Sequence, residues 1–294
     1  MSSPPPLFSV VIPTHDNVEV LKQCLAGWQQ HADGASVELL VIEDGCKDGT
    51  ADFLRAQADT PWGQRHLRWF HEEDVHELNC DNRGFREARG QFLLVWHDDM
   101  HLRANWLLPE LACSLRAHPE IGLISLSRGL MCHPVEGAIS TWEELLQWDR
   151  LESTIGTAPL NWLCFSEVDI VVRPWVVRRE CLDTVGALDP AFVPTEWDEA
   201  DLCFRLREGG WKVATHGYER EGAYVHLLSS TMSKTPSERL KANALRNGKL
   251  FHARWDAHIA ARQGHRYQRW RRRFAGGSFA NLLGLMLGRV THRA

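Results

Sequence analysis

Short apolar runs alternate with segments of helical periodicity along the first 126 residues of the chain. Between the runs, apolar side chains recur three or four positions apart, as Leu21, Leu25 and Trp28 do. Each run is short and ends in polar or turn-forming residues, which predicts a buried strand. The predicted strands cover residues 8–14, 37–42, 67–70, 92–96 and 121–126. This alternation predicts βαβ units, an α/β fold and a mostly parallel sheet flanked by helices.

The second half of the chain has a less regular pattern. It predicts a strand over 168–172, a short strand that ends at Val225-His226, and a helix that runs from the acidic segment 196–202 to Arg207. Further helices are expected over 82–90, 106–117 with a kink near Pro109, 142–151, 175–185 and 236–262. We expect the irregular residues 127–166 to carry substrate specificity.

Polar residues follow three of the predicted strands. Right-handed crossovers place the carboxyl ends of parallel strands along one edge, so Thr14-His15-Asp16, Glu43-Asp44 and Asp98-Asp99 should share a rim. Two adjacent carboxylates repel each other unless a cation lies nearby, and a hard divalent cation commonly bridges carboxylates to substrate phosphates. An isolated Asp-Asp pair could equally be a solvated acidic turn. Three polar strand ends at one rim favour the metal site.

Glycine-rich phosphate loops are missing from the sequence. There is no G-x-x-x-x-G-K-[ST] motif, and no G-x-G-x-x-G motif follows the first strand. If phosphate binds at the predicted rim, a metal ion must therefore neutralise it.

Composition narrows the class of protein. The 294 residues, 44% of them hydrophobic and 24% charged, can bury one large core or two moderate ones. The formal net charge of −5 gives no general case for nucleic-acid binding. The eight cysteines form no C-x-x-C pair, which favours a reducing compartment over a zinc site or a disulfide framework. The start of the chain does not resemble a signal peptide, so we expect a cytoplasmic protein.

The last 38 residues differ in charge from the rest. From Ala257 onward there is no acidic residue, and a run of arginines precedes the apolar stretch Phe279–Leu287. We expect one large domain over 1–235 and a helical extension over 236–294, whose basic tail lies on an anionic membrane surface, peripheral to the inner face of the cell membrane. The alternative is a disordered basic tail or a helix packed on the body.

Five motifs in fixed order resemble those of the inverting family-2 glycosyltransferases of the GT-A fold, over roughly residues 8 to 230. They are Val10-Val11-Ile12-Pro13-Thr14-His15-Asp16, Glu43-Asp44-Gly45 through Thr50, Asn82-Arg83-Gly84 through Gly90, His97-Asp98-Asp99, and Asp198-Glu199-Ala200-Asp201-Leu202. Two positions depart from the family pattern. His97 replaces the first acid of the Asp-x-Asp metal motif, and the family's Glu-Asp pair is inverted to Asp198-Glu199.

The resemblance implies transfer of a sugar from a nucleotide-diphosphate donor, of the UDP or dTDP type, to a hydroxyl of a glycan or lipid-linked acceptor. It implies Mn²⁺ or Mg²⁺ held by Asp99, with Asp98 and His226 as the other metal-site residues. Glu199 takes the position of the catalytic base, with Asp198 as its substitute, and a single base with direct displacement implies inversion.

The same resemblance assigns a donor pocket. Asp44 would accept a hydrogen bond from the nucleotide base, and His15 would lie against that base. The turn residues Pro13, Thr14 and Asp16, together with Asn79, Asn82 and Asp98, would contact the nucleotide sugar. The asparagines could instead cap helices, and His15 could cap its turn.

Two other functions remain open from the sequence. One is a catalytically inactive relative that binds carbohydrate or nucleotide. The other is a sugar-phosphate nucleotidyltransferase, although the turn after the first strand, Pro13-Thr14-His15-Asp16, has neither the glycine-rich loop nor the basic residue expected of that class.

Overall fold

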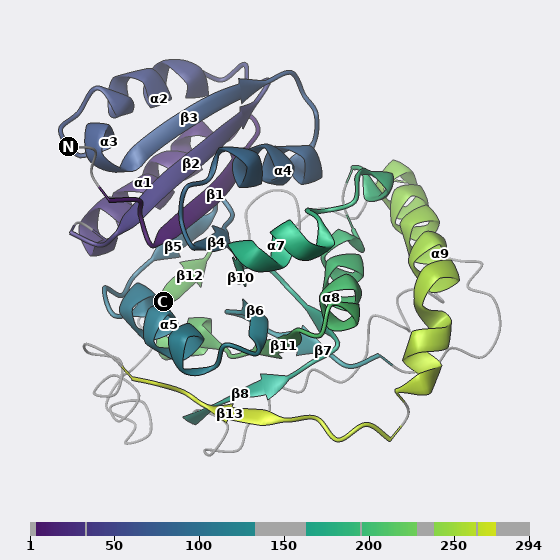
Figure 1. Ribbon diagram of the computed structural model, residues 1–294. Coiled ribbons are helices and arrows are strands. Elements are labelled where there is room, and N and C mark those ends of the chain that lie inside the picture. The colour runs from purple at the N-terminus through teal and green to yellow at the C-terminus, as the bar shows by residue number, and fades with distance from the viewer. Residues whose placement is uncertain are drawn as a thin grey trace.

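The computed structural model describes residues 4–32, 34–132, 163–194, 196–227, 238–262 and 264–274. The described part is built on one nine-stranded sheet with helices on both faces (Figure 1). The sheet order is β3-β2-β1-β4-β10-β6-β11-β8-β13, and two small sheets pair β5 with β12 and β7 with β9. The strands are β1 (Phe8–Thr14), β2 (Val37–Asp44), β3 (Leu67–Glu72), β4 (Phe92–Val95), β5 (Met100–Leu102), β6 (Ile121–Ser125), β7 (Gly129–Leu130), β8 (Cys164–Glu167), β9 (Ile170–Val171), β10 (Trp175–Arg178), β11 (Lys212–Thr215), β12 (Tyr224–His226) and β13 (Arg269–Arg271).

Most strands of the large sheet run in one direction. β1 is parallel to β2 and β4, and β2 is parallel to β3. β10 is antiparallel to both of its neighbours, which restores the original direction in β6 and β11. Only β8 and β10 of the nine strands oppose the rest. The predicted α/β fold with a mostly parallel sheet is therefore confirmed, and β1, β2 and β4 end at the same edge.

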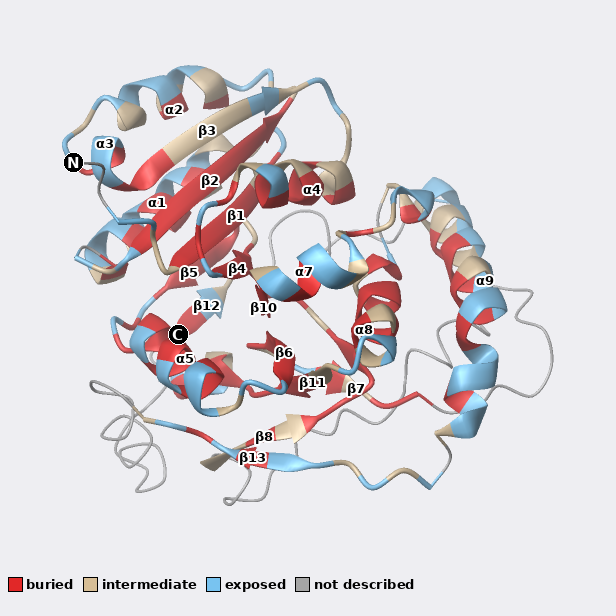
Figure 2. Ribbon diagram, viewed as in Figure 1, coloured by how far each residue is buried: buried red, intermediate tan, exposed pale blue. Residues whose placement is uncertain are grey.

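Side-chain alternation divides the core into two layers. In β1, Val10 and Ile12 face one cluster of buried residues while Val11 faces the other. The first layer is closed by α1 and α5, and the second by α4, α7, α8 and α9. β1 and β2 are buried along almost their whole length, as central parallel strands should be (Figure 2). The helices are α1 (Val18–Ala32), α2 (Thr50–Ala58), α3 (Gly63–His66), α4 (Glu77–Glu87), α5 (Leu107–Ala117), α7 (Arg179–Val185), α8 (Asp198–Glu208) and α9 (Glu238–Ala261).

The helix predicted over 175–185 is wrong for its first four residues. Trp175–Arg178 form β10 in the middle of the sheet, and the helix begins only at Arg179. A strand that is buried on both faces has no polar alternation, so its pattern cannot be separated from that of a buried helix.

Other boundaries also moved. The helix expected over 82–90 is α4 and begins earlier, at Glu77. Pro109 causes no kink because it lies in the first turn of α5, where its missing N–H has no helical acceptor. Of the strand expected over 168–172, only Ile170–Val171 form a strand, β9, and β8, β11 and β13 were not predicted. The helix expected over 142–151 lies outside the described residues.

The segment after residue 237 packs on the body in its described part. Phe251 and Trp255 of α9 contact Phe204 of α8. β13 pairs with β8 at the edge of the sheet, and the next residue, Arg272, is fully buried. The apolar stretch Phe279–Leu287 lies outside the described residues. Within the described ranges, no helix has the length and apolar character needed to cross a bilayer.

Candidate active site

A short antiparallel pairing brings residues from distant parts of the chain together at the carboxyl edge of the sheet. Asp99 directly precedes β5, and His226 ends β12, which pairs with β5 in a register that sets His226 opposite Met100. The backbone N–H of Leu227 donates to the carbonyl of Asp99 at 3.0 Å, which closes this pairing. The turn between β4 and β5 adds His97. The sequence therefore builds a three-residue cluster from one turn and one strand end.

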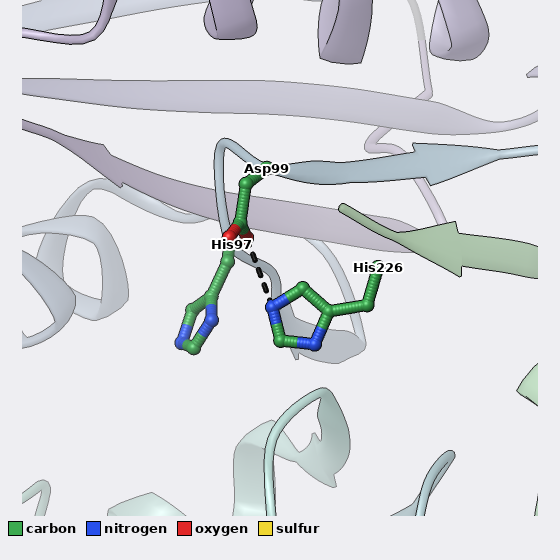
Figure 3. A group of neighbouring side chains, drawn as sticks. All are labelled: His97, Asp99 and His226. Atoms are coloured by element: carbon green, nitrogen blue, oxygen red, sulfur yellow. Dashed lines mark ion pairs between the residues drawn. The ribbon is translucent and has the colours of Figure 1, made fainter. Parts of the chain in front are cut away.

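The cluster contains two imidazoles and one carboxylate. One ligand atom from each of His97, Asp99 and His226 lies within 4.8 Å of the others. The Nε2 atom of His226 is 3.1 Å from Oδ1 of Asp99, and the two rings are 5.9 Å apart (Figure 3). Figure 3 shows the Asp99 carboxylate reaching toward the ring of His226, with the His97 ring beside them. This donor set is suited to a divalent transition metal such as Mn²⁺.

Asp98 lies outside this cluster although the sequence predicts it as a metal ligand. Its Oδ2 accepts a hydrogen bond of 2.7 Å from the hydroxyl of Thr14, across the β1–β4 edge. Burial raises the pKa of Asp98 to about 6. His97, at the place of the family's first acid, lies in the cluster instead.

A buried arginine connects the cluster to a group of carboxylates. Nε2 of His97 lies 3.1 Å from Glu77, and Glu77 lies 3.5 Å from Nη1 of Arg173. Burial alone would lower the pKa of His97, but the Glu77 carboxylate raises it. Arg173 also contacts Asp81 at 2.8 Å and Asp198 at 3.0 Å, and its side chain is only 7% exposed.

Glu199 is a fourth carboxylate beside Arg173, 3.3 Å from Nη1, and one guanidinium cannot neutralise four carboxylates in a buried site. Burial raises the pKa of Asp81 and of Asp198, and the negative charge of their neighbours adds to this rise. Glu77 and Arg173 were not predicted as site residues. An arginine inside the apolar stretch from Val168 to Val177 is the signal that could have found Arg173, because arginine is almost never buried without partners.

The two candidate bases occupy different environments at the start of α8. The Asp198 side chain is fully buried against Arg173, whereas the Glu199 side chain is 18% exposed and lies 3.3 Å from the same guanidinium. Burial raises the pKa of Glu199 well above its usual range, and Arg173 offsets only part of that rise. Glu199 is thus the carboxylate of the pair that solvent or a substrate can reach.

The backbone before α8 is strained. Glu196 and Trp197 have φ angles of 77° and 70°, in the left-handed region that side-chain-bearing residues rarely adopt. The Trp197 ring packs 5.1 Å from that of Phe251 in α9, which helps to hold this turn in place. Such strain persists only where the surrounding structure fixes it, and it concentrates at functional sites.

The predicted donor-pocket residues lie at the same edge, and several are already hydrogen-bonded. Both carboxylate oxygens of Asp44 accept backbone N–H groups, from Val75 at 2.6 Å and from His76 at 3.0 Å. The exposed His15 ring bonds through Nδ1 to the carbonyl of Asp44 at 2.6 Å. A ligand could therefore bind to the remaining lone pairs of the Asp44 carboxylate and stack on the face of the His15 ring.

The remaining predicted contacts have structural partners. Asn82 donates to and accepts from the backbone of Leu188 and so ties α4 to the loop before α8. Asn79 donates to the carbonyl of Val75 within its own helix turn. Asp16 accepts from the N–H of Lys47, and Pro13 pairs with Ile42 in the sheet. Asn79 and Asn82 therefore hold the backbone of Val75 and of Leu188 in place.

Comparison with known proteins agrees with this architecture. The family model described as "Glycosyltransferase like family 2" matches residues 4–250, which is most of the chain. The chain belongs to this glycosyltransferase family. The resemblance carried by the five sequence motifs is thereby confirmed.

Two curated relatives of this family-2 glycosyltransferase match it over only part of their own length. The uncharacterized protein y4gI of Sinorhizobium fredii is 23% identical over 271 residues, which cover 86% of this chain and 28% of that protein. Glycosyltransferase AglE of Haloferax volcanii is 28% identical over 108 residues, which cover 36% of this chain and 35% of that protein. The alignments thus span about a third or less of these relatives.

Two solved structures share the GT-A fold. GalNAc-T7 with UDP, GalNAc and Mn²⁺ gives a TM-score of 0.63 at 14% identity, covering 86% of this chain and 49% of that one. The mannosyltransferase PcManGT from Pyrobaculum calidifontis, in complex with GDP-Man and Mn²⁺, gives 0.51 at 16% identity, covering 97% and 81%. At these identities the likeness shows the fold, and the predicted GT-A architecture is confirmed.

Proposed function

We propose that this protein transfers a sugar from a nucleotide-diphosphate donor to a hydroxyl acceptor with a divalent metal ion, and inverts the anomeric carbon. The observation that carries the proposal is the chain of contacts from the His97, Asp99 and His226 cluster, through Glu77 and Arg173, to Glu199. These contacts connect a set of metal ligands to a solvent-accessible carboxylate, at the edge where α/β sheets bind ligands.

The donor set fits Mn²⁺ better than Mg²⁺. Two imidazole nitrogens and one carboxylate oxygen suit a first-row transition metal, whereas Mg²⁺ prefers oxygen ligands throughout. We propose His97, Asp99 and His226 as the ligands. When bound, the ion would act as a Lewis acid for the leaving diphosphate. Glu77 beside His97 orients that ring, as carboxylates next to metal-bound histidines do.

Glu199 is our proposed general base. Its position at the first turn of α8 fixes the carboxylate, and Arg173 favours the ionised form that can accept the proton of the acceptor hydroxyl. Asp198 is buried beneath it as a partner of Arg173. A single base with direct attack of the acceptor gives an inverted product. The family match and the position of Glu199 support this assignment.

We propose the chemical class of the donor from the residues at the rim of the sheet. Asp44 and His15 lie at the rim where we place the nucleotide base, and Asp98, bonded to Thr14, is the chain neighbour of Asp99 in the metal cluster. We propose a pyrimidine nucleotide, of the UDP or dTDP type, and a glycan or lipid-linked acceptor. PcManGT is described with GDP-Man and GalNAc-T7 with UDP, so a guanine nucleotide is the competing outcome of the test.

The experiment is a screen of nucleotide sugars for release of nucleoside diphosphate, with Mn²⁺, with Mg²⁺ and with EDTA. We expect turnover with one class of donor, loss of turnover in EDTA, and inversion in the transferred product. Binding of a donor without turnover under any acceptor would instead support an inactive binding relative. Release of pyrophosphate from a nucleoside triphosphate and a sugar phosphate would support a nucleotidyltransferase.

We further propose that the basic tail places the enzyme on an anionic membrane surface at the cytoplasmic face. Arg266, Arg269, Arg271 and Arg273 are exposed in the described part of that tail. Truncation after residue 274 keeps β13, Arg272 and these four arginines, and it removes the apolar stretch Phe279–Leu287 together with Arg289 and Arg293. We expect the truncated protein to stay folded and to sediment less with vesicles of anionic lipid. Equal sedimentation of both proteins would contradict the membrane role.

A further inference from the structure

A cavity lies at the opposite edge of the sheet from the candidate active site. It has a volume of about 460 Å³, within the range of small-molecule sites. Its walls come from the segments that lead into β1, β2 and β4 and from the adjoining ends of α5 and α7. The lining residues are Pro5, Pro6, Leu7, Ser36, Arg89, Gly90, Gln91, Arg116 and Arg179.

The charge of this cavity is positive only. Three arginines line it, and the described lining residues include no aspartate or glutamate. Among the described residues, neither Arg89 nor Arg116 forms an ion pair or a side-chain hydrogen bond, and both are exposed. Surface arginines elsewhere in the chain commonly face a carboxylate, as Arg55 does with Asp52. The cavity therefore has an uncompensated charge of about three positive units.

Arg179 is held in a fixed position at the floor of the cavity. Its Nε donates to the carbonyl of Gly90 at 2.8 Å, and its backbone N–H donates to the carbonyl of Gln91 at 3.0 Å. Its Nη2 atom is buried and has no hydrogen-bond partner among the described residues. A buried donor without an acceptor is costly, and an anionic ligand would supply the missing acceptor.

The floor itself is rigid. Gly90 packs so closely on β1 that an added Cβ would lie 2.6 Å from the backbone nitrogen of Ser9. The N–H of Gly90 donates to the Ser9 hydroxyl at 2.8 Å, and the N–H of Arg89 donates to Glu38 at 2.7 Å. The arginines thus project from backbone that is already hydrogen-bonded, so the guanidinium of Arg179 loses little freedom when it binds a ligand.

We propose that this cavity binds a phosphate group carried by a small molecule or by a lipid headgroup. The paired N–H donors of a guanidinium match the geometry of phosphate oxygens. Three guanidinium groups carry more positive charge than a single carboxylate would neutralise, which favours phosphate as the ligand. Pro5, Pro6 and Leu7 give the cavity an apolar wall that suits the organic part of a phosphate ester. The site is separate from the proposed transferase site and does not depend on it.

The arrangement of the tail is compatible with a lipid headgroup. Arg273 donates through its backbone N–H to Ser114 at 3.0 Å, and His118 bonds to the carbonyl of Arg271 at 2.8 Å. Ser114 and Arg116 belong to the same last turn of α5. The basic segment therefore passes the end of the helix that supplies one of the cavity arginines.

The first arm of the test uses inorganic phosphate in EDTA, so that no metal ion can bind phosphate at the other edge. Melting temperature is followed against phosphate concentration at constant ionic strength with chloride as the balancing anion. The double variant R89Q/R116Q removes two exposed arginines without touching the core. R86Q/R220Q removes two exposed arginines elsewhere and is the charge-matched control. We expect R89Q/R116Q to weaken apparent phosphate affinity about tenfold or more, and the control to match the wild type.

The second arm uses vesicles of phosphatidylcholine with and without phosphatidic acid, and measures sedimentation of the same three proteins. Phosphate stabilisation that depends on Arg89 and Arg116 assigns the site to soluble phosphate compounds. Vesicle binding that depends on them, without a response to free phosphate, assigns it to a lipid headgroup. The proposal is overturned if neither probe distinguishes R89Q/R116Q from R86Q/R220Q. Failure here leaves the transferase proposal intact, because sugar transfer is not the readout.

Discussion

The guanidinium of Arg173 lies 3.3 Å from the carboxylate of Glu199 in a buried environment. Arg173 also reaches Glu77, which holds His97 of the metal-ligand cluster. Arg173 therefore links the proposed base, through Glu77, to a ligand of the proposed metal site. A bare carboxylate at this depth would favour its protonated form, and Arg173 is the group that favours the ionised one.

The first prediction concerns the pH dependence of turnover. Burial raises the pKa of Glu199 above that of an ordinary glutamate. A base must be ionised, so kcat should fall as pH decreases through this raised pKa. We expect an acid limb in kcat well above pH 4.5, measured at saturating Mn²⁺ and donor so that metal loss does not contribute. A kcat that stays constant down to pH 5 would contradict Glu199 as the base.

The second prediction separates Glu199 from Asp198. Glu199→Gln keeps size and removes basicity, so kcat should fall about 10²–10⁴-fold while donor affinity stays nearly unchanged. The residual activity should also lack the acid limb. Asp198→Asn removes a buried partner of Arg173 and should lower the free energy of unfolding, which a denaturant titration measures. If Glu199→Gln retains full kcat and a folded Asp198→Asn loses it, Asp198 is the base.

The third prediction tests which residue completes the metal site. The structure places His97 in the ligand cluster and Asp98 against Thr14. Mn²⁺ affinity, measured by electron paramagnetic resonance of the free ion, should weaken at least about tenfold in His97→Ala. Asp98→Asn keeps an acceptor for the Thr14 hydroxyl and should change it far less. A larger loss of Mn²⁺ affinity in Asp98→Asn than in His97→Ala would instead support Asp98 as the metal ligand, as the sequence predicts.

The fourth prediction concerns stability at the far end of the sheet. Arg272 is fully buried between Glu110 at 2.5 Å and Glu221 at 2.6 Å. Arg272→Met leaves both carboxylates without this partner and should lower the free energy of unfolding by about 3–5 kcal/mol in urea titrations. Arg271→Met, at the exposed neighbouring position, should change it by no more than about 0.5 kcal/mol. Equal effects of the two substitutions would show that the buried ion pairs contribute nothing specific.

The sequence predicts the first half of the fold well because its strands differ in period from its helices. β1, β2 and β4 are apolar runs that stop at polar turns, and their polar ends meet at one rim as expected. β10 was missed because a strand buried on both faces has no alternation to read. β13 was missed because an edge strand of sequence Arg-Trp-Arg is indistinguishable from a basic tail.

The candidate site is predictable only in part. Asp99, His226 and Glu199 follow from motif order, and all three lie at the expected edge. The local sequence can identify Arg173 as a buried arginine, but its contact with Glu77 joins segments far apart in the sequence, which no local pattern encodes. Asp44 and Asn82 were predicted to contact the donor, but their polar groups form hydrogen bonds mainly with backbone groups of this chain. The sequence alone does not show these partners.

The most direct test of the account is calorimetric titration of UDP, and of GDP in parallel, into the wild type and into Asp99→Ala, with Mn²⁺ and with EDTA. Asp99 is the carboxylate of the ligand cluster and directly precedes β5. We predict that one nucleotide binds the wild type only with Mn²⁺, and that Asp99→Ala loses this metal-dependent binding while its circular dichroism and melting curve show a folded protein. Mn²⁺-dependent binding of equal affinity in Asp99→Ala would contradict the metal site on which the proposed function rests.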